Sequence, residues 1–201
     1  DMQTPVDSDN SGKGFEALKP ARRGALECVS FVTEAPDPWH ALYAYGTAGE
    51  EAKRVALRKL ELGGDTLHPA CFLNQDCHEL WVGGELIGLC SINTEAKTEG
   101  DTADIVIGLK SIFLLGDFRG HGVSSVFIDC IWKDLAAAIT STAAEATEAG
   151  VERLILLLIA DFQTEEGEGV FSHFEALLDS YSNSLASGFN LDIEVKTDAG
   201  S

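Results

Sequence analysis

The sequence predicts an α/β (α+β) fold in which a mixed, mostly antiparallel central sheet is flanked by helices. Three observations support this fold class. Short apolar segments have the length of strands, a glycine pair joins two of them as a hairpin, and segments with apolar residues at helical spacing separate others. A hairpin is antiparallel, whereas strands separated by helices favour parallel pairing, so the sheet should contain both directions.

Length and composition indicate one well-buried domain. The chain has 201 residues, of which 45% are hydrophobic and 23% charged. Residues 1–24 are polar and predict a flexible tail, which leaves 25–201 as a single domain. Apolar runs are too short for a membrane helix, and the polar, acidic start does not resemble a signal peptide. Five irregularly spaced cysteines fit reduced thiols better than disulfides, so we expect a cytoplasmic protein.

The charge is strongly negative and unevenly distributed. Fourteen basic and 33 acidic residues give a formal net charge of −19. Residues 141–201 contain twelve acids but only Arg153 and Lys196 as cations. Such a field repels nucleic acid and anionic membranes, so we expect neither as a partner. The acidic surface either keeps the protein soluble or favours a cationic partner such as an amine.

The first predicted elements are a strand and a helix. Ala25 to Thr33 alternates enough to form a strand, which the following prolines close. Glu50 to Leu62 repeats apolar residues at helical spacing, and Glu50 can pair with Arg54 one turn later. Gly63-Gly64 then ends the helix.

A hairpin and a long strand follow. Glu79 to Val82 and Glu85 to Ile92 are rich in β-forming residues, and Gly83-Gly84 between them can adopt the positive φ angles of a tight turn. We expect residues 95–101 to form a polar loop. The nearly continuous apolar run from Ile105 to Leu115 then predicts a strand buried on both faces.

The last elements alternate between helix and strand. They are a helix from Val123 to about Glu148, a strand from Arg153 to Ala160, a helix from Val170 to Leu185 and a strand from Leu191 to Val195. Ligands of such sheets bind where strands part at their carboxyl ends.

The segment from Phe118 to Ser125 is the most informative motif, because it joins the long apolar strand to the following helix. Two glycines, Gly120 and Gly122, let the backbone approach a ligand closely. Backbone N–H groups and the positive end of the helix dipole would then point at an anion. The motif therefore predicts a phosphate-binding site.

This motif and the order of elements resemble the GNAT superfamily of acyl-CoA-dependent N-acyltransferases. The family signature is Arg or Gln, two residues, Gly, one residue, then Gly or Ala. Here Arg119, Gly122 and Ser124 occupy these positions, and the final serine departs from the pattern. The resemblance extends from about Ala25 to Phe189, where Gly188-Phe189 is similar to the Gly-Phe that follows the family's fourth helix.

The resemblance implies acetyl-CoA as acyl donor and direct attack by a primary amine in a ternary complex. The acceptor would be a cationic small molecule or a protein amine. Leu114 would direct its backbone N–H at the thioester carbonyl, beside Leu115 at the strand end. The pyrophosphate would contact the loop and the first turn of the helix, that is Arg119, Gly120, His121, Gly122, Val123, Ser124 and Ser125.

The base and the acid are less defined. Gly108 and Lys110 stand where relatives with a direct base have an acid, which leaves Asp104, Glu85 or Glu95 acting through water. Each of these is alternatively a surface charge. Tyr181 is the candidate acid for the departing thiolate, although a packed core tyrosine fits its place on the apolar stripe. His173 on the same helix is the other candidate.

The sequence also allows two other functions and a homodimeric assembly. The missing acid and the final serine would suit a GNAT-like domain that binds CoA without catalysis. His68, Cys71, Cys77 and His78 lie within eleven residues and have the chemistry of zinc ligands, although their spacing matches no compact zinc motif. Only one strand is predicted after Phe189, where relatives have two, and a second copy supplying the other would make a homodimer.

Overall fold

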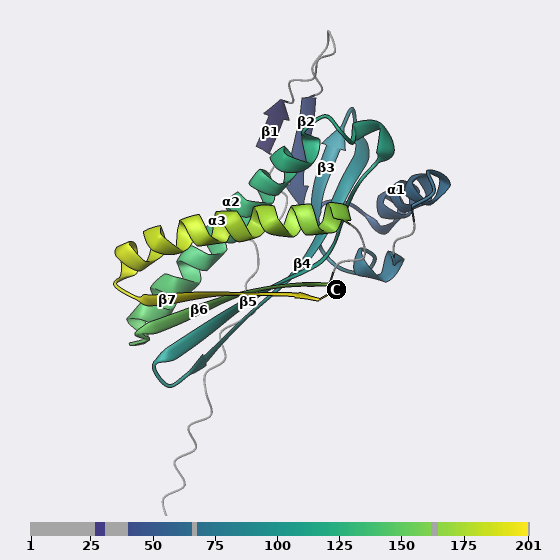
Figure 1. Ribbon diagram of the computed structural model, residues 1–201. Helices are drawn as coiled ribbons and strands as arrows, with labels where there is room; N and C mark the ends of the chain where they lie inside the picture. Colours follow the sequence, from purple (N-terminus) through teal and green to yellow (C-terminus); the bar gives the residue numbers. More distant parts are fainter. Residues whose placement is uncertain (1–26, 31–39, 66–67, 162–164, 201) are drawn as a thin grey trace, which may run out of the picture.

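The computed structural model of the chain describes residues 27–30, 40–65, 68–161 and 165–200 (Figure 1). Within them the strands form one sheet and the buried apolar side chains form one core. The predicted tail, residues 1–24, lies outside the described residues. No helix in the described ranges is long and apolar enough to cross a membrane.

Seven strands lie side by side in the order in which they occur in the chain. They are β1 (Glu27–Ser30), β2 (His40–Tyr45), β3 (His78–Val82), β4 (Glu85–Glu99), β5 (Thr102–Leu114), β6 (Arg153–Asp161) and β7 (Asp192–Gly200). Neighbours from β1 to β5 are antiparallel, whereas β5 with β6 and β6 with β7 are parallel. This mixed, mostly antiparallel sheet confirms the predicted fold class.

The helices cover the two faces of the sheet unequally. They are α1 (Glu50–Leu62), α2 (Val123–Glu148) and α3 (Glu165–Phe189), with the short 3₁₀ turns η1 (Pro69–Cys71) and η2 (Gly116–Phe118). The ring of Tyr43 in β2 meets Phe127 of α2 on one face, and Trp132 of α2 meets Tyr181 of α3. On the other face Phe113 of β5 meets Phe72, which follows η1. Figure 1 shows α2 and α3 crossing over the long strands, with α1 at the opposite end.

Several element boundaries differ from the sequence prediction. The helix from Glu50 to Leu62 and the Gly83-Gly84 hairpin are confirmed. The predicted loop at 95–101 is wrong, because β4 continues to Glu99 and turns back at Gly100. The prediction that the long strand is buried on both faces is also wrong for its first half, where buried and partly exposed residues alternate. β2 was not predicted.

A buried hydrogen-bond chain fixes α2 to the first half of the sheet. The Tyr43 hydroxyl donates to Oδ2 of Asp134 in α2 at 2.7 Å, and it lies 2.7 Å from Nδ1 of His78 in β3. A hydroxyl has one proton, and that of Tyr43 is already donated in the hydrogen bond to Asp134. The second bond must therefore be donated by Nδ1–H of His78 to the Tyr43 oxygen. His78 is 2% exposed, and its burial lowers the pKa of the imidazole to about 3.

The low pKa of His78 predicts a loss of stability in acid. In the unfolded chain His78 takes up a proton below its ordinary pKa of 6.5, whereas the folded protein does so only near pH 3. The stability due to neutral His78 is therefore complete above pH 6.5 and is lost as the pH falls toward 3. We expect this residue to lower the free energy of unfolding by up to about 1.4 kcal/mol per pH unit in that window.

Urea unfolding at several pH values measures this contribution. His78→Gln keeps an N–H donor for Tyr43 but cannot titrate, so it should show a shallower loss of stability below pH 6.5 than the unaltered protein. If the free energy of unfolding fell equally with pH in both proteins, His78 would not be the source of the acid sensitivity.

Candidate functional site

The glycine segment forms an open turn at the start of α2. Gly120 and Gly122 have φ angles of 77° and 73°, which glycine adopts at little energetic cost. Gly122 is the N-cap of α2 and has no side chain to cap the N–H groups of the first turn. A Cβ atom built on either glycine would have no described atom within 4 Å. This turn can therefore admit an anion to the N-terminus of a 26-residue helix.

Residues around the two glycines share this open position. Val123 is buried under the turn, whereas His121, Ser124 and Ser125 are exposed. The two serines add hydroxyl groups to the backbone donors of the first turn. The five predicted phosphate-contacting residues after Gly120, that is residues 121–125, thus all lie at the same end of α2.

Arg119 is predicted to contact the pyrophosphate of CoA, but in the structure its side chain bonds other residues of the protein. Its Nε donates to the Leu114 carbonyl at 2.8 Å, and its two Nη atoms bond the Asp65 carboxylate at 3.2 and 2.7 Å. The guanidinium therefore joins the end of β5 to the segment after α1. A phosphate in the glycine turn would have to compete with Asp65 for this side chain.

Leu114 stands on a strand edge that β6 does not cover. The β5–β6 ladder ends with the pair Leu109 and Ala160, whereas β5 continues to Leu114. The Leu115 N–H donates to Ile87 of β4 at 2.8 Å. Backbone amides of an extended strand alternate in direction, so the Leu114 N–H points away from β4, toward the side on which β6 has ended.

Gly88 keeps the side chain of Leu114 close to the sheet. The two residues are partners across β4 and β5. A Cβ on Gly88 would lie 2.7 Å from Cδ2 of Leu114 and 3.1 Å from the Phe113 carbonyl. No side chain larger than hydrogen fits at this position without displacing the end of β5.

The three candidate bases do not gather at this site. Asp104 precedes Leu114 by ten residues in β5, which is about 30 Å along a strand, and it pairs with Lys97 at 3.3 Å. Glu95 is exposed opposite Val106 in the same distant half of the hairpin. Glu85 is nearer, about 10 Å along β4 from Gly88, and it accepts a bond from Lys59 at 2.6 Å.

The candidate acid Tyr181 is engaged between two helices. Its hydroxyl donates to the Ala136 carbonyl of α2 at 2.9 Å and also bonds Thr140. Ala136 follows Gly122 by 14 residues, which corresponds to about 21 Å along α2. The structure therefore does not bring Tyr181 to Leu114. Tyr181 also follows the start of α3 by 16 residues, about 24 Å along the helix, and so lies far from the carboxyl end of β6.

His173 lies closer to the open end of the sheet. It is eight residues into α3, and its Nε2 is 3.4 Å from Oδ1 of Asp129, which is six residues into α2. Both side chains are partly exposed. Of the acids and bases named from the sequence, His173 is the one that the starts of α2 and α3 place together with a carboxylate.

The four predicted zinc ligands are not brought together. His78 faces α2 and bonds Tyr43. Its neighbour Cys77 contacts Nζ of the buried Lys53 at 3.8 Å instead, and burial raises the pKa of this thiol to about 11 although Lys53 opposes the shift. His68 is exposed beside η1. No group of three potential metal ligands occurs among the residues that the structure describes.

Sequence reasoning missed Asp65 and Asp129, the partners of Arg119 and His173. Asp65 is separated from Arg119 by 54 residues, and Asp129 from His173 by 44. Neither carboxylate belongs to a local motif. The only local signal is that Asp65 directly follows Gly63-Gly64, the pair that ends the helix and so fixes the start of the next segment.

Comparison with solved structures shows a loose likeness to an acetyltransferase. No family model matches the chain, and no curated protein sequence is significantly similar to it. Among solved structures it resembles aminoglycoside N-acetyltransferase AAC(6')-Iy in complex with CoA, with 18% identity and a TM-score of 0.37. The match covers 71% of this chain and 90% of that one. So loose a superposition assigns neither family nor activity, and the function has to be argued from the residues.

The open glycine turn predicts a selective effect of adding one methyl group. Gly122→Ala and Gly100→Ala both force a Cβ onto a left-handed residue with open space around it. Each should therefore lower the free energy of unfolding by about 1–2 kcal/mol. Only Gly122→Ala should weaken acetyl-CoA binding, because Gly100 lies in the distant β4–β5 turn.

Calorimetric titration of both variants with acetyl-CoA, beside urea unfolding, separates the two effects. Equal affinity in the two variants would remove the glycine turn from the binding site.

Proposed function

We propose that the protein transfers an acetyl or other acyl group from acyl-CoA to a primary amine in a ternary complex. One observation carries this proposal. The open glycine turn, Gly120 to Ser125, lies a few residues beyond Leu114, where β5 is no longer paired with β6 among the described residues. A thioester whose pyrophosphate occupies the turn can lay its carbonyl along that edge, where a strand would otherwise pair.

The chain's own groups suit the two charges of the reaction. As the amine nitrogen attacks the thioester carbon, negative charge gathers on the carbonyl oxygen, and the Leu114 N–H is directed at the side where that oxygen would lie. The carbon–sulfur bond then breaks, the amine loses a proton to water or a carboxylate, and the sulfur takes one up. Arg119 holds the Leu114 carbonyl at 2.8 Å and so fixes the direction of the neighbouring N–H.

His173 is the better placed of the two candidate acids. Its Nε2 lies 3.4 Å from a carboxylate oxygen of Asp129, which can orient the imidazole toward a departing thiolate. The Tyr181 hydroxyl already donates to Ala136. Cationic acceptors, whether small amines or protein amines, remain consistent with the net charge of −19.

A second candidate function is binding of CoA without turnover. The specific observation in its favour is the position of the acids and bases. Asp104 and Glu95 lie in the distant half of the hairpin, and Glu85 is paired with Lys59. A domain of this kind would keep the glycine turn and the β5 edge while lacking a proton acceptor for the amine.

Binding and turnover distinguish the two functions. Acetyl-CoA in hundredfold excess over its Kd should stabilise the folded protein by about 2.7 kcal/mol and raise its melting temperature. A screen of primary amines with detection of free thiol should then find an acceptor. A raised melting temperature without thiol release on any amine would support the binding domain, and an unchanged melting temperature would contradict both functions.

Substitution of the two candidate acids tests their assignment. Tyr181→Phe should leave kcat within about threefold of the unaltered enzyme while lowering the free energy of unfolding by about 1 kcal/mol, since only a helix–helix hydrogen bond is lost. His173→Gln should lower kcat by roughly 10²-fold at little change in stability.

Steady-state rates with an accepted amine at saturating acetyl-CoA measure both variants. The reverse pattern, with kcat lost in Tyr181→Phe and kept in His173→Gln, would restore the tyrosine as the acid.

A further inference from the structure

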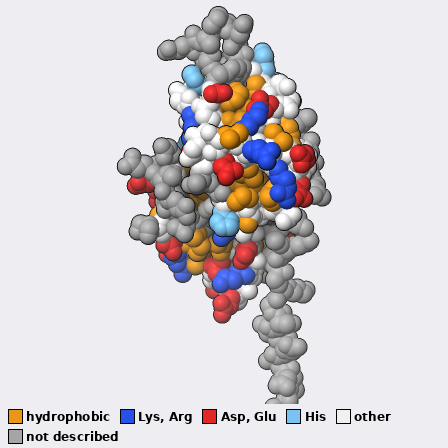
Figure 2. All heavy atoms as spheres, turned by 90° about the vertical axis from the view of Figure 1, so that its right-hand side faces the viewer, with side chains coloured by type: hydrophobic (Ala, Val, Ile, Leu, Met, Phe, Trp, Pro, Cys, Tyr) orange, Lys and Arg blue, Asp and Glu red, His pale blue; other side chains and the backbone are white. Residues whose placement is uncertain are grey.

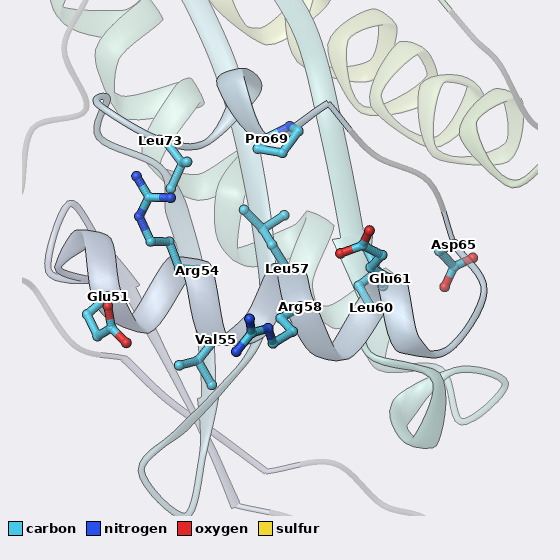
Figure 3. Close-up of a pocket in the computed structure, with 10 residues that line it drawn as sticks. All are labelled: Glu51, Arg54, Val55, Leu57, Arg58, Leu60, Glu61, Asp65, Pro69 and Leu73. Carbon is cyan, nitrogen blue, oxygen red and sulfur yellow. The ribbon is translucent and has the colours of Figure 1, made fainter.

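A groove beside α1 lies outside the proposed acyl-transfer site. It has a volume of about 560 Å³, within the size range of small-molecule sites. It runs between α1 and the segment of η1, and Figure 3 shows the residues that line it. The lining combines apolar and charged side chains, namely Glu51, Arg54, Val55, Leu57, Arg58, Leu60, Glu61, Asp65, Pro69 and Leu73.

The charges of the groove are ordered along α1. In Figure 3 Arg54 and Arg58 occupy the middle stretch, with Glu51 toward one end and Glu61 and Asp65 toward the other. Arg54 and Arg58 are one helical turn apart, so they share one side of α1. The two guanidinium groups therefore lie together in the middle of the groove, with carboxylates toward its two ends.

The two guanidinium groups are available to a ligand to different degrees. Arg54 donates from Nε and Nη2 to Glu50, four residues earlier on its own helix, and its side chain is 57% exposed. Arg58 has no carboxylate within ion-pair distance among the residues that the structure places. Asp65, in contrast, is neutralised by Arg119.

Apolar side chains supply the rest of the lining. Val55 is 47% exposed, which is unusual for a large apolar residue of a sheet-packed helix. Leu57, Pro69 and Leu73 continue the apolar lining toward η1. Figure 2, which views the molecule from the side of α1, shows Lys and Arg side chains directly beside hydrophobic ones.

From these features we infer that the groove is a second ligand site, which takes a carboxylate or phosphate carried on an apolar body. The anionic group lies on Arg58 and Arg54, and the apolar part packs on Val55 and the η1 side. A guanidinium binds both anions through paired N–H donors. The site is distinct from the glycine turn, because no residue from Gly120 to Ser125 lines the groove, and only Asp65 at one end bonds Arg119.

Titration with simple amphiphiles tests the inference. The probes are octanoate, octyl phosphate and octylammonium, added in the absence of acetyl-CoA so that the result does not depend on the proposed function. Octanoate or octyl phosphate should bind and shift the backbone amide signals of α1 and residues 69–73 in NMR spectra. Octylammonium has the same apolar body with the opposite charge, and it should bind at least tenfold more weakly.

Variants then locate the anion. Arg58→Gln should weaken binding of the preferred anion by about tenfold, the equivalent of one charge-assisted hydrogen bond, and Arg54→Gln should weaken it less. Lys97→Gln removes an exposed cation from the distant hairpin and should have no effect. Whichever of octanoate and octyl phosphate binds more tightly identifies the group. Equal binding of octylammonium, or unchanged affinity in Arg58→Gln, would overturn the inference.

Discussion

The early end of the β5–β6 ladder is the constraint on which the proposed site depends. Hydrogen bonds pair the two strands only as far as Leu109 and Ala160, and β5 then continues to Leu114 paired with β4 but not with β6. Backbone groups on such an edge need a partner, and a ligand that presents amide-like groups can provide one. Because α2 begins just beyond this edge, the same end of the sheet combines strand donors with a helix N-terminus.

Residues around the edge maintain it in different ways. Gly88 leaves room for the Leu114 side chain, and the Leu115 N–H continues the ladder with β4 on the opposite side. Arg119 donates a hydrogen bond to the Leu114 carbonyl and, through its bonds to Asp65, connects this strand end to the segment that follows α1. Deeper in the molecule, the bonds of Tyr43 to Asp134 and His78 hold the middle of α2 to β2 and β3. The start of α2 therefore has a fixed direction relative to the strand edge.

Much of the fold could be predicted from local pattern. Helix α1 was predicted with both of its ends, because Glu50 pairs with Arg54 and Gly63-Gly64 stops it. The second half of β4 could not be, because its charged residues alternate with small ones, and a strand with one face open to solvent then has the composition of a loop. The open turn before α2 could be predicted from its two glycines, whose φ angles are both positive. The actual neighbours of Arg119 and Tyr181 were not, since Asp65 and Ala136 meet them only through tertiary packing.

Hydrogen–deuterium exchange at single amides, with and without CoA, tests the central claim most directly, because it reports on the strand edge itself. CoA should slow exchange at Leu114 and at the amides from Gly120 to Ser125. Exchange at Gly100, in the distant hairpin turn, should not change. Protection confined to other parts of the chain, or none at a saturating concentration of CoA, would contradict the claim that the open end of β5 and the glycine turn form one binding site.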